Sequence, residues 1–240
     1  MAHTASYRRI LHKMGYYNYQ AGLIVRHLNQ EGGWNTHNRK CREFIIRAVD
    51  ILRPSKITVL GSGWLLEFPV AEIAERADKL VLADIVHPPE VINQTAGISN
   101  IELLESDLTG GLIEEVWEKT SGSIFSQRVR SVSEICIPGF DLPDPGLVIS
   151  LNLLTQLEIL PVKLLQRKTS LSEESLEQFS IKVQEKHIEF LGRHNSILIS
   201  DTAELLTDKK GNKTERPTLK TTLPDGKLKE IGRASCRERV

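Results

Sequence analysis

The sequence predicts an α/β fold: a doubly wound, mostly parallel sheet with helices on both faces, preceded by an N-terminal helical cap. Short apolar runs recur along the chain and alternate with segments of helical periodicity. The runs are nearly continuous, which is typical of strands buried on both faces of a parallel sheet. Each run is followed closely by a glycine or a polar residue. Polar groups are therefore expected along one edge of the sheet.

Residues 1–53 are predicted to form the helical cap. In CREFIIRAVDIL, at 41–52, the apolar residues recur at helical spacing. Arg53-Pro54 ends this helix, because proline disfavours the α conformation in the residue before it. EGGW at 31–34 predicts a break. We expect residues 10–40 to pack over the carboxyl ends of the strands.

The segment from 54 to 229 is predicted to form the sheet and its covering helices. Its strands are expected at 57–60, 80–82 with Asp84 at the end, 101–104, 147–151 and 197–199. A helix is expected over 70–77, with Pro69 suited to its first turn. Ser170-x-x-Glu173 predicts a capping box that opens a long helix ending near residue 191.

Two segments do not follow the alternation of strand and helix. The connection over 110–146 contains one helical piece and then polar, proline-rich sequence; long connections of this kind are often functional. PTLKTTLPDGKLK, at 217–229, predicts a hairpin with its turn at Pro224-Asp225-Gly226.

The composition argues against several classes of protein. The chain has 31 basic and 31 acidic residues, so it lacks the net positive charge expected of a nucleic-acid-binding protein. It has no apolar run long enough to span a membrane and no visible signal peptide, so a cytoplasmic location is expected. Cys41 and Cys136 suggest neither a disulfide framework nor a metal site.

The C-terminal segment 230–240, EIGRASCRERV, resembles the translation of a sequencing-adapter oligonucleotide. We expect it to be a non-native tail and exclude it from the fold.

The first apolar run leads into VLGSGWLLEFP, in which Gly61, Ser62 and Gly63 precede a predicted helix. Glycine permits positive φ and close approach of a ligand, and a helix N-terminus attracts negative charge. Open parallel sheets bind their ligands at the carboxyl ends of the strands. Asp84 lies 84 − 61 = 23 residues after Gly61, close to the spacing of about 20 at which an acid reaches a ribose diol. Asp107 follows the third strand.

This arrangement resembles the Rossmann-like, class I S-adenosylmethionine-dependent methyltransferases over about residues 56–201. The resemblance implies that the glycine loop wraps the methionine and ribose of the cofactor. It implies that Asp84 binds the ribose hydroxyls, that Asp107 meets the adenine amino group, and that strand four ends near the reacting methyl. The cofactor-binding residues expected are Gly61, Ser62, Gly63, Trp64, Glu67, Asp84, Ile85, Asp107, Leu108 (through its backbone) and Asn152.

The sequence departs from this family at three places. Val59 stands where the family usually has an acid, and we expect Glu67 to supply that charge to the cofactor ammonium. Trp64 replaces the third glycine; it either packs against the cofactor or closes the site against the N-terminal helices. The antiparallel hairpin that usually completes the sheet is expected to be truncated by the tail.

Each candidate residue also has a purely structural interpretation. Gly61 and Gly63 alternatively make a tight turn only, and Asp107 alternatively caps a helix. Asn152 is alternatively a satisfied polar residue at a strand end, and Glu67 a solvated charge at a helix start. Tyr16, Tyr17 and Tyr19 are interpreted as packing residues in preference to a substrate lid, and His87 as a loop residue in preference to a base.

The sequence thus predicts a methyltransferase that uses S-adenosylmethionine, acts on a small-molecule acceptor bordered by the cap, and contains no metal site. No catalytic base is identified. Two alternatives stay open. A nicotinamide-dependent oxidoreductase is one, although Leu66 stands where its motif needs a small residue. A non-catalytic scaffold that kept the fold is the other.

Overall fold

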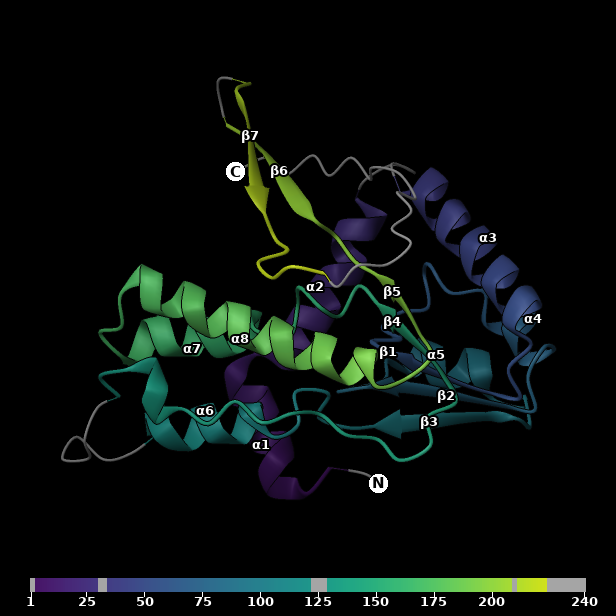
Figure 1. Cartoon of the computed structure of the whole chain (residues 1–240), viewed down its shortest axis with the longest axis horizontal. Coiled ribbons are helices and arrows are strands. Elements are labelled where there is room, and N and C mark those ends of the chain that lie inside the picture. The colour runs from purple at the N-terminus through teal and green to yellow at the C-terminus, as the bar shows by residue number, and fades with distance from the viewer. Residues whose placement is uncertain (1–2, 30–33, 122–128, 209–210, 224–240) are drawn as a thin grey trace.

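The computed structural model of the chain describes residues 3–29, 34–121, 129–208 and 211–223. Within these ranges the chain forms an α/β structure with a five-stranded parallel sheet flanked by helices (Figure 1). The adapter-like tail and the turn predicted at 224–226 lie outside the described residues. No helix in the described ranges combines the length and the apolar character needed to cross a bilayer.

The helices and strands follow the predicted alternation, and all five predicted strands are confirmed. The N-terminal helices are α1 (Ala5–Met14), α2 (Tyr16–Leu28) and α3 (Asn35–Leu52). The later elements are β1 (Lys56–Leu60), α4 (Val70–Ala74), β2 (Lys79–Asp84), α5 (Pro89–Thr95), β3 (Ile101–Glu105), α6 (Leu112–Ser121), the 3-10 helix η1 (Val132–Glu134), β4 (Leu147–Leu151), α7 (Ile159–Lys168), α8 (Glu173–Gly192), β5 (Ser196–Ile199), β6 (Ala203–Thr207) and β7 (Lys213–Pro217).

The sheet has the strand order β3-β2-β1-β4-β5, and every neighbouring pair is parallel. After β3 the chain therefore crosses β1 and continues on its other side. This change of direction creates a switch point between β1 and β4, where doubly wound sheets bind ligands. The glycine loop follows β1 and Asn152 follows β4, so both predicted features lie at this point.

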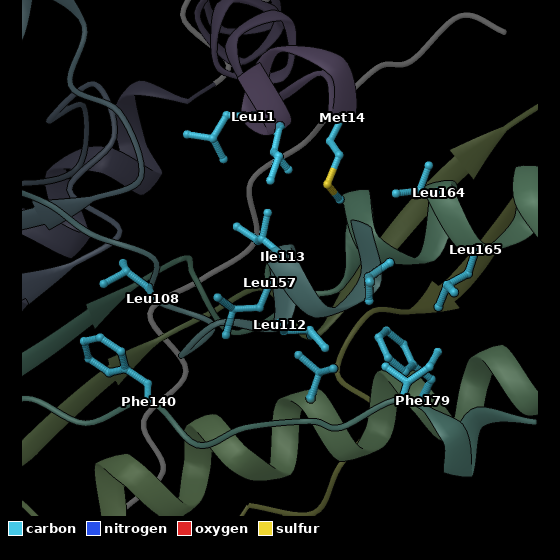
Figure 2. Packing of buried hydrophobic residues seen from close by; sticks show 14 of the residues in the cluster. Leu11, Met14, Leu108, Leu112, Ile113, Phe140, Leu157, Leu164, Leu165 and Phe179 are labelled. Atoms are coloured by element: carbon cyan, nitrogen blue, oxygen red, sulfur yellow. The ribbon is translucent and has the colours of Figure 1, made fainter. Parts of the chain in front are cut away.

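The sheet separates two apolar clusters, because successive strand residues point to opposite faces. Val59 joins the cluster beneath α3 and α4, whereas Leu60 joins the cluster formed with α1, α6, α7 and α8. Figure 1 shows α6, α7 and α8 grouped together, apart from α3 and α4. Figure 2 shows Leu11 and Met14 of α1 above Ile113 of α6. The first helix of the cap is thus part of the main core.

Local sequence explains where the N-terminal helices begin and end. The Thr4 hydroxyl accepts a hydrogen bond from the Tyr7 N–H and caps α1. Gly15, with φ of 92°, ends α1 and allows α2 to start at once. The third helix ends at Arg53, which takes a left-handed conformation directly before Pro54. The predicted end of this helix is confirmed.

The boundaries of two helices differ from the prediction. The fourth helix covers only Val70–Ala74, because the Asn100 side-chain amide donates to the Ala74 and Ala77 carbonyls at its end. The N-cap of α8 is Ser172, not Ser170. The Ser172 backbone is extended, and its hydroxyl accepts from the Ser175 N–H. Two glutamates then occupy the first turn, where the helix dipole favours negative charge.

The C-terminal hairpin also differs from the prediction. It is formed by β6 and β7, which pair antiparallel from Ala203 opposite Pro217 to Thr207 opposite Lys213. The predicted hairpin over 217–229 begins where this one ends. Because every residue of β7 is exposed, its sequence KTERP carries no apolar alternation that predicts a strand. The two strands form a sheet of their own, and β5 is the last strand of the parallel sheet among the described residues (Figure 1).

Candidate functional site

The glycine loop is shaped partly by the end of β4. Gly61 has φ of 76°, and a Cβ added there would lie 2.9 Å from the Leu151 carbonyl oxygen and 3.0 Å from the Leu153 Cβ. The backbone of the β4 end therefore requires glycine at this position, as the interpretation of a tight turn proposes. Gly63 has φ of 52°, and a Cβ added there would meet only the Gly61 carbonyl oxygen, at 3.9 Å. The left-handed backbone, and not a packed neighbour, accounts for glycine at position 63.

Asp84 lies directly against this loop. The Gly63 N–H donates to Asp84 Oδ2 at 2.7 Å, and the Ile85 N–H donates to Oδ1 at 2.7 Å. The side chain is only 7% exposed. Burial raises the pKa of the Asp84 carboxyl, while the two N–H groups and the nearby His87 oppose this rise. The structure thus brings together the loop and the acid that the sequence singled out.

Trp64 contacts the N-terminal helices. Its indole Nε1 donates to the Gln20 carbonyl oxygen of α2 at 3.0 Å. Of the two interpretations given for Trp64, this contact supports the one in which Trp64 closes the site against the N-terminal helices. The Gln20 side chain also reaches the site, since its Nε2 donates to Asp84 Oδ1 at 3.3 Å.

Contacts from α2 and from the residues before α1 reach the carboxyl ends of β1 and β2, whereas α1 packs with α6 and α7 and α3 lies with α4, so the prediction for residues 10–40 holds only for α2. His3 Nε2 lies 2.8 Å from the carbonyl oxygen of Ile85, which follows β2. Gln20 and Trp64 join α2 to the glycine loop, as described above. The Lys163 ammonium of α7 lies 5.7 Å from the centre of the Tyr19 ring. That the cap borders an acceptor stays a prediction.

Asp107 fixes the turn before α6. Its Oδ1 accepts from the Thr109 N–H and hydroxyl, and its Oδ2 accepts from the Gly111 N–H at 3.1 Å. These contacts agree with the structural interpretation, in which Asp107 caps a helix. The neighbouring Leu108 side chain is buried in the core (Figure 2). Contacts of Asp107 and the Leu108 backbone with adenine stay predictions.

Two tyrosines of the cap lie near Asp107. The Tyr7 and Tyr16 hydroxyls are buried, and the Tyr16 hydroxyl has no hydrogen-bond partner among the residues described. Burial raises the pKa of both phenols, and the negative charge of Asp107 raises it further. Both hydroxyls therefore stay protonated and can donate a hydrogen bond.

Two smaller polar residues of the predicted site also hold buried, unpartnered oxygens. Asn152 takes a left-handed conformation with φ of 51°, and its N–H donates to the Ile199 carbonyl. Its Oδ1 is buried and unpaired within the described ranges, as is the Ser62 hydroxyl. The interpretation of Asn152 as a satisfied polar residue therefore does not hold for its side-chain oxygen.

Glu67 lies in a different electrostatic environment from Asp84. Burial raises its pKa, the charge of Asp201 beyond β5 raises it further, and Arg42 of α3 opposes the rise. His37 and Cys41 of α3 belong to the same surroundings, with His37 Nε2 3.4 Å from Cys41 Sγ. Glu67 is thus not the fully solvated charge of the structural interpretation. Its contact with a cofactor ammonium stays a prediction.

The structure adds two residues to the site that sequence reasoning did not assign, Gln20 and His87. His87 is 5% exposed, and neither of its ring nitrogens has a partner in the described part of the chain. Its position three residues after Asp84 was the available signal. Gln20 had no such signal, because it is an ordinary helix residue whose contact with Asp84 spans 64 residues of sequence.

A pair of buried polar residues, Ser150 and His187, lies on the face of the sheet opposite to α3. Ser150 Oγ lies 2.8 Å from His187 Nε2 of α8, and both residues are buried. Burial lowers the pKa of His187 to about 4. A cavity of about 10 Å³ lies beside His187, with room for about one water molecule. Because both side chains are inaccessible, the pair is structural.

The larger recess lies away from the candidate site. It has a volume of about 290 Å³ and is lined by residues at the amino ends of β1 and β4, among them Pro54, Lys56 and Gly146. The described residues hold no group of three or more His, Cys, Asp or Glu side chains arranged to bind a metal ion. The polar groups at the carboxyl ends of the strands therefore remain the candidate site.

Comparison of the chain with protein-family models, with curated proteins and with solved structures finds no match.

Proposed function

We propose that this chain is an S-adenosylmethionine-dependent methyltransferase that acts on a small-molecule acceptor. One observation carries the proposal: the Gly63 N–H donates to the Asp84 carboxylate at the carboxyl ends of β1 and β2. Backbone N–H groups and a carboxylate meet there beside a switch point of the sheet, which is the setting in which such sheets bind nucleosides.

The buried polar atoms around this contact support a ligand of that kind. Ser62 Oγ, Gln20 Oε1, Asn152 Oδ1 and both His87 nitrogens have no hydrogen-bond partner among the described residues. An unsatisfied buried donor or acceptor costs about 1–3 kcal/mol, so several together are a considerable burden. A nucleoside with an amino-acid tail carries both donors and acceptors, and therefore fits this set of groups.

In the proposed function each group of the site has a defined part. Asp84 accepts from the ribose hydroxyls, the Gly61–Gly63 backbone lies along the ribose and methionine, and Asp107 with the Leu108 backbone meets the adenine. Asn152 lies near the methyl to be transferred. The cofactor supplies an activated methyl group when bound, so the protein mainly orients the acceptor and excludes water. No residue is assigned as a base.

The alternative of a non-catalytic scaffold is favoured by one observation. Asp84 is buried beneath α2, and its oxygens already accept from Gly63, Ile85 and Gln20. A protein that had lost its ligand would be expected to fill the crevice in this way.

Calorimetric titration separates these functions. The proposed function predicts that S-adenosylhomocysteine and S-adenosylmethionine bind and that NADH does not. Transfer of a labelled methyl group to a panel of small acceptors then tests for turnover. Binding of NADH without either sulfur nucleoside would identify an oxidoreductase, and binding of no nucleoside would identify a scaffold.

A further inference from the structure

We propose that Gln20 and His87 are additional ligand-binding residues that flank Asp84 and contact the two ribose hydroxyls. This inference rests on the proposed function and extends it. It makes the N-terminal helical segment part of the nucleoside site, whereas the sequence assigned that segment only to the acceptor.

Gln20 approaches Asp84 from α2. Its Nε2 donates to Asp84 Oδ1 at 3.3 Å, and its backbone carbonyl accepts from Trp64 Nε1 at 3.0 Å. The residue is therefore held at both its backbone and its side chain. Its Oε1 is buried and has no partner within the described ranges, although it lies on the same amide that already contacts Asp84. A hydroxyl group that donates its proton to Asp84 can accept the second hydrogen of this amide at its oxygen.

His87 follows Asp84 by three residues and lies near enough to act electrostatically on its carboxyl group. It belongs to the loop between β2 and α5, and Pro88 and Pro89 follow it and restrict its backbone. The side chain is 95% buried, given its exposure of 5%, and both ring nitrogens lack partners among the described residues. An imidazole carries a ring N–H donor in either neutral tautomer and in its protonated form. A ribose hydroxyl that donates its proton to Asp84 can accept from a ring N–H of His87.

The chemistry of the diol requires groups of this kind. A carboxylate can accept from both hydroxyls of a ribose, but it cannot donate to either hydroxyl oxygen. Gln20 retains a second amide hydrogen, and His87 has a ring N–H. Asp84, Gln20 and His87 together therefore offer acceptors and donors to a diol, and a single carboxylate does not.

The experiment measures binding of S-adenosylhomocysteine by calorimetry to the parent chain and to the variants Gln20→Met and His87→Phe. Both variants keep the approximate size and remove the polar atoms. The matched controls are Gln166→Met and His12→Phe, which change exposed residues on α7 and α1. We expect each site variant to bind about tenfold more weakly, since one hydrogen bond to a buried partner is lost, and each control to bind like the parent.

The 2′,3′-dideoxy analogue of S-adenosylhomocysteine distinguishes contact from structural support. If the two residues act on the hydroxyls, Gln20→Met and His87→Phe should bind this analogue as the parent does. An equal loss for both ligands would show that the residues only support the fold, and would overturn the inference. Thermal melting checks folding, and His87→Leu replaces His87→Phe if the larger ring is not tolerated.

The inference and the proposed function fail in different ways. A parent chain that does not bind S-adenosylhomocysteine overturns both. A parent chain that binds it, with site variants that bind equally tightly, overturns only the roles of Gln20 and His87.

Discussion

Replacement of Asp84 by alanine should affect both ligand binding and stability. The sequence alone suggests that a strand-end carboxylate contributes little to the fold. In the structure, however, Asp84 accepts two backbone N–H bonds of 2.7 Å and is only 7% exposed. Alanine would leave the Gly63 and Ile85 N–H groups without this acceptor, inside a largely buried turn.

The size of both effects follows from these contacts. Hydrogen bonds to charged groups contribute about 1.5–3 kcal/mol each, and loss of a single ribose contact should weaken S-adenosylhomocysteine binding on the order of 10- to 150-fold. For stability, the relief of a buried charge offsets part of the loss. We therefore expect the free energy of unfolding to fall by about 2 kcal/mol, which lowers Tm by about 4–8 °C in a domain of this size.

The assay must separate the two effects. Calorimetric titration at about 15 °C, near the temperature of maximum stability of typical domains, keeps both proteins folded. Circular dichroism can verify this, and differential scanning calorimetry gives the change in Tm. Asp84→Asn should be intermediate in binding, since the amide keeps one acceptor and loses the charge. If Asp84→Ala binds S-adenosylhomocysteine as tightly as the parent chain does, the assignment of Asp84 to the ribose is wrong.

Two further predictions concern stability. Gly61→Ala should lower the free energy of unfolding by about 1–3 kcal/mol, because φ is 76° and the new Cβ would meet the Leu151 carbonyl at 2.9 Å. Its control, Gly22→Ala, places the new Cβ in open space on α2 and should raise the free energy of unfolding by about 0.5–1 kcal/mol. Urea denaturation measures both, and a neutral Gly61→Ala would contradict the close packing of the loop on β4. For His187 the unfolded pKa of about 6.5 exceeds the folded value of about 4, so the unfolded state binds more protons between these values. Stability should be complete above about pH 6.5 and fall by up to about 3 kcal/mol as the pH drops towards about 4. His187→Gln should show a smaller loss over this range in parallel urea titrations, and equal pH profiles would contradict a buried neutral imidazole.

The sequence predicted the elements that bury apolar surface. All five strands of the sheet were found from their apolar runs, and the end of α3 from Arg53-Pro54. The exposed strand β7 was missed, because polar residues on a solvated hairpin carry no such pattern. Ser172 was missed as a cap because the capping-box rule favours Ser170, which has Glu173 three residues later, whereas Ser172 has Ser175 at that position.

The candidate site likewise contains residues that the sequence predicted and residues that it did not. Gly63 and Asp84 were identified because their spacing along the chain reflects the geometry of the strand and helix between them. Gln20 was not, because its contact with Asp84 depends on how α2 packs, 64 residues away in the sequence. Ser150 and His187 are likewise joined across 37 residues, and neither has a local sequence signal for the other. Contacts between residues that lie far apart in the sequence depend on how the helices pack, and local residue patterns do not predict them.

The burial of Leu11 and Met14 among residues of α6, α7 and α8 bears on how the protein can be divided. A fragment beginning at residue 54 would expose the apolar surfaces of α6 and α7 that α1 covers, and would be prone to aggregation. Because α1 and the helices of the sheet share one apolar cluster, they should unfold in a single cooperative transition. The N-terminal segment and the sheet thus form one folding unit, and biochemical work on the candidate site requires both.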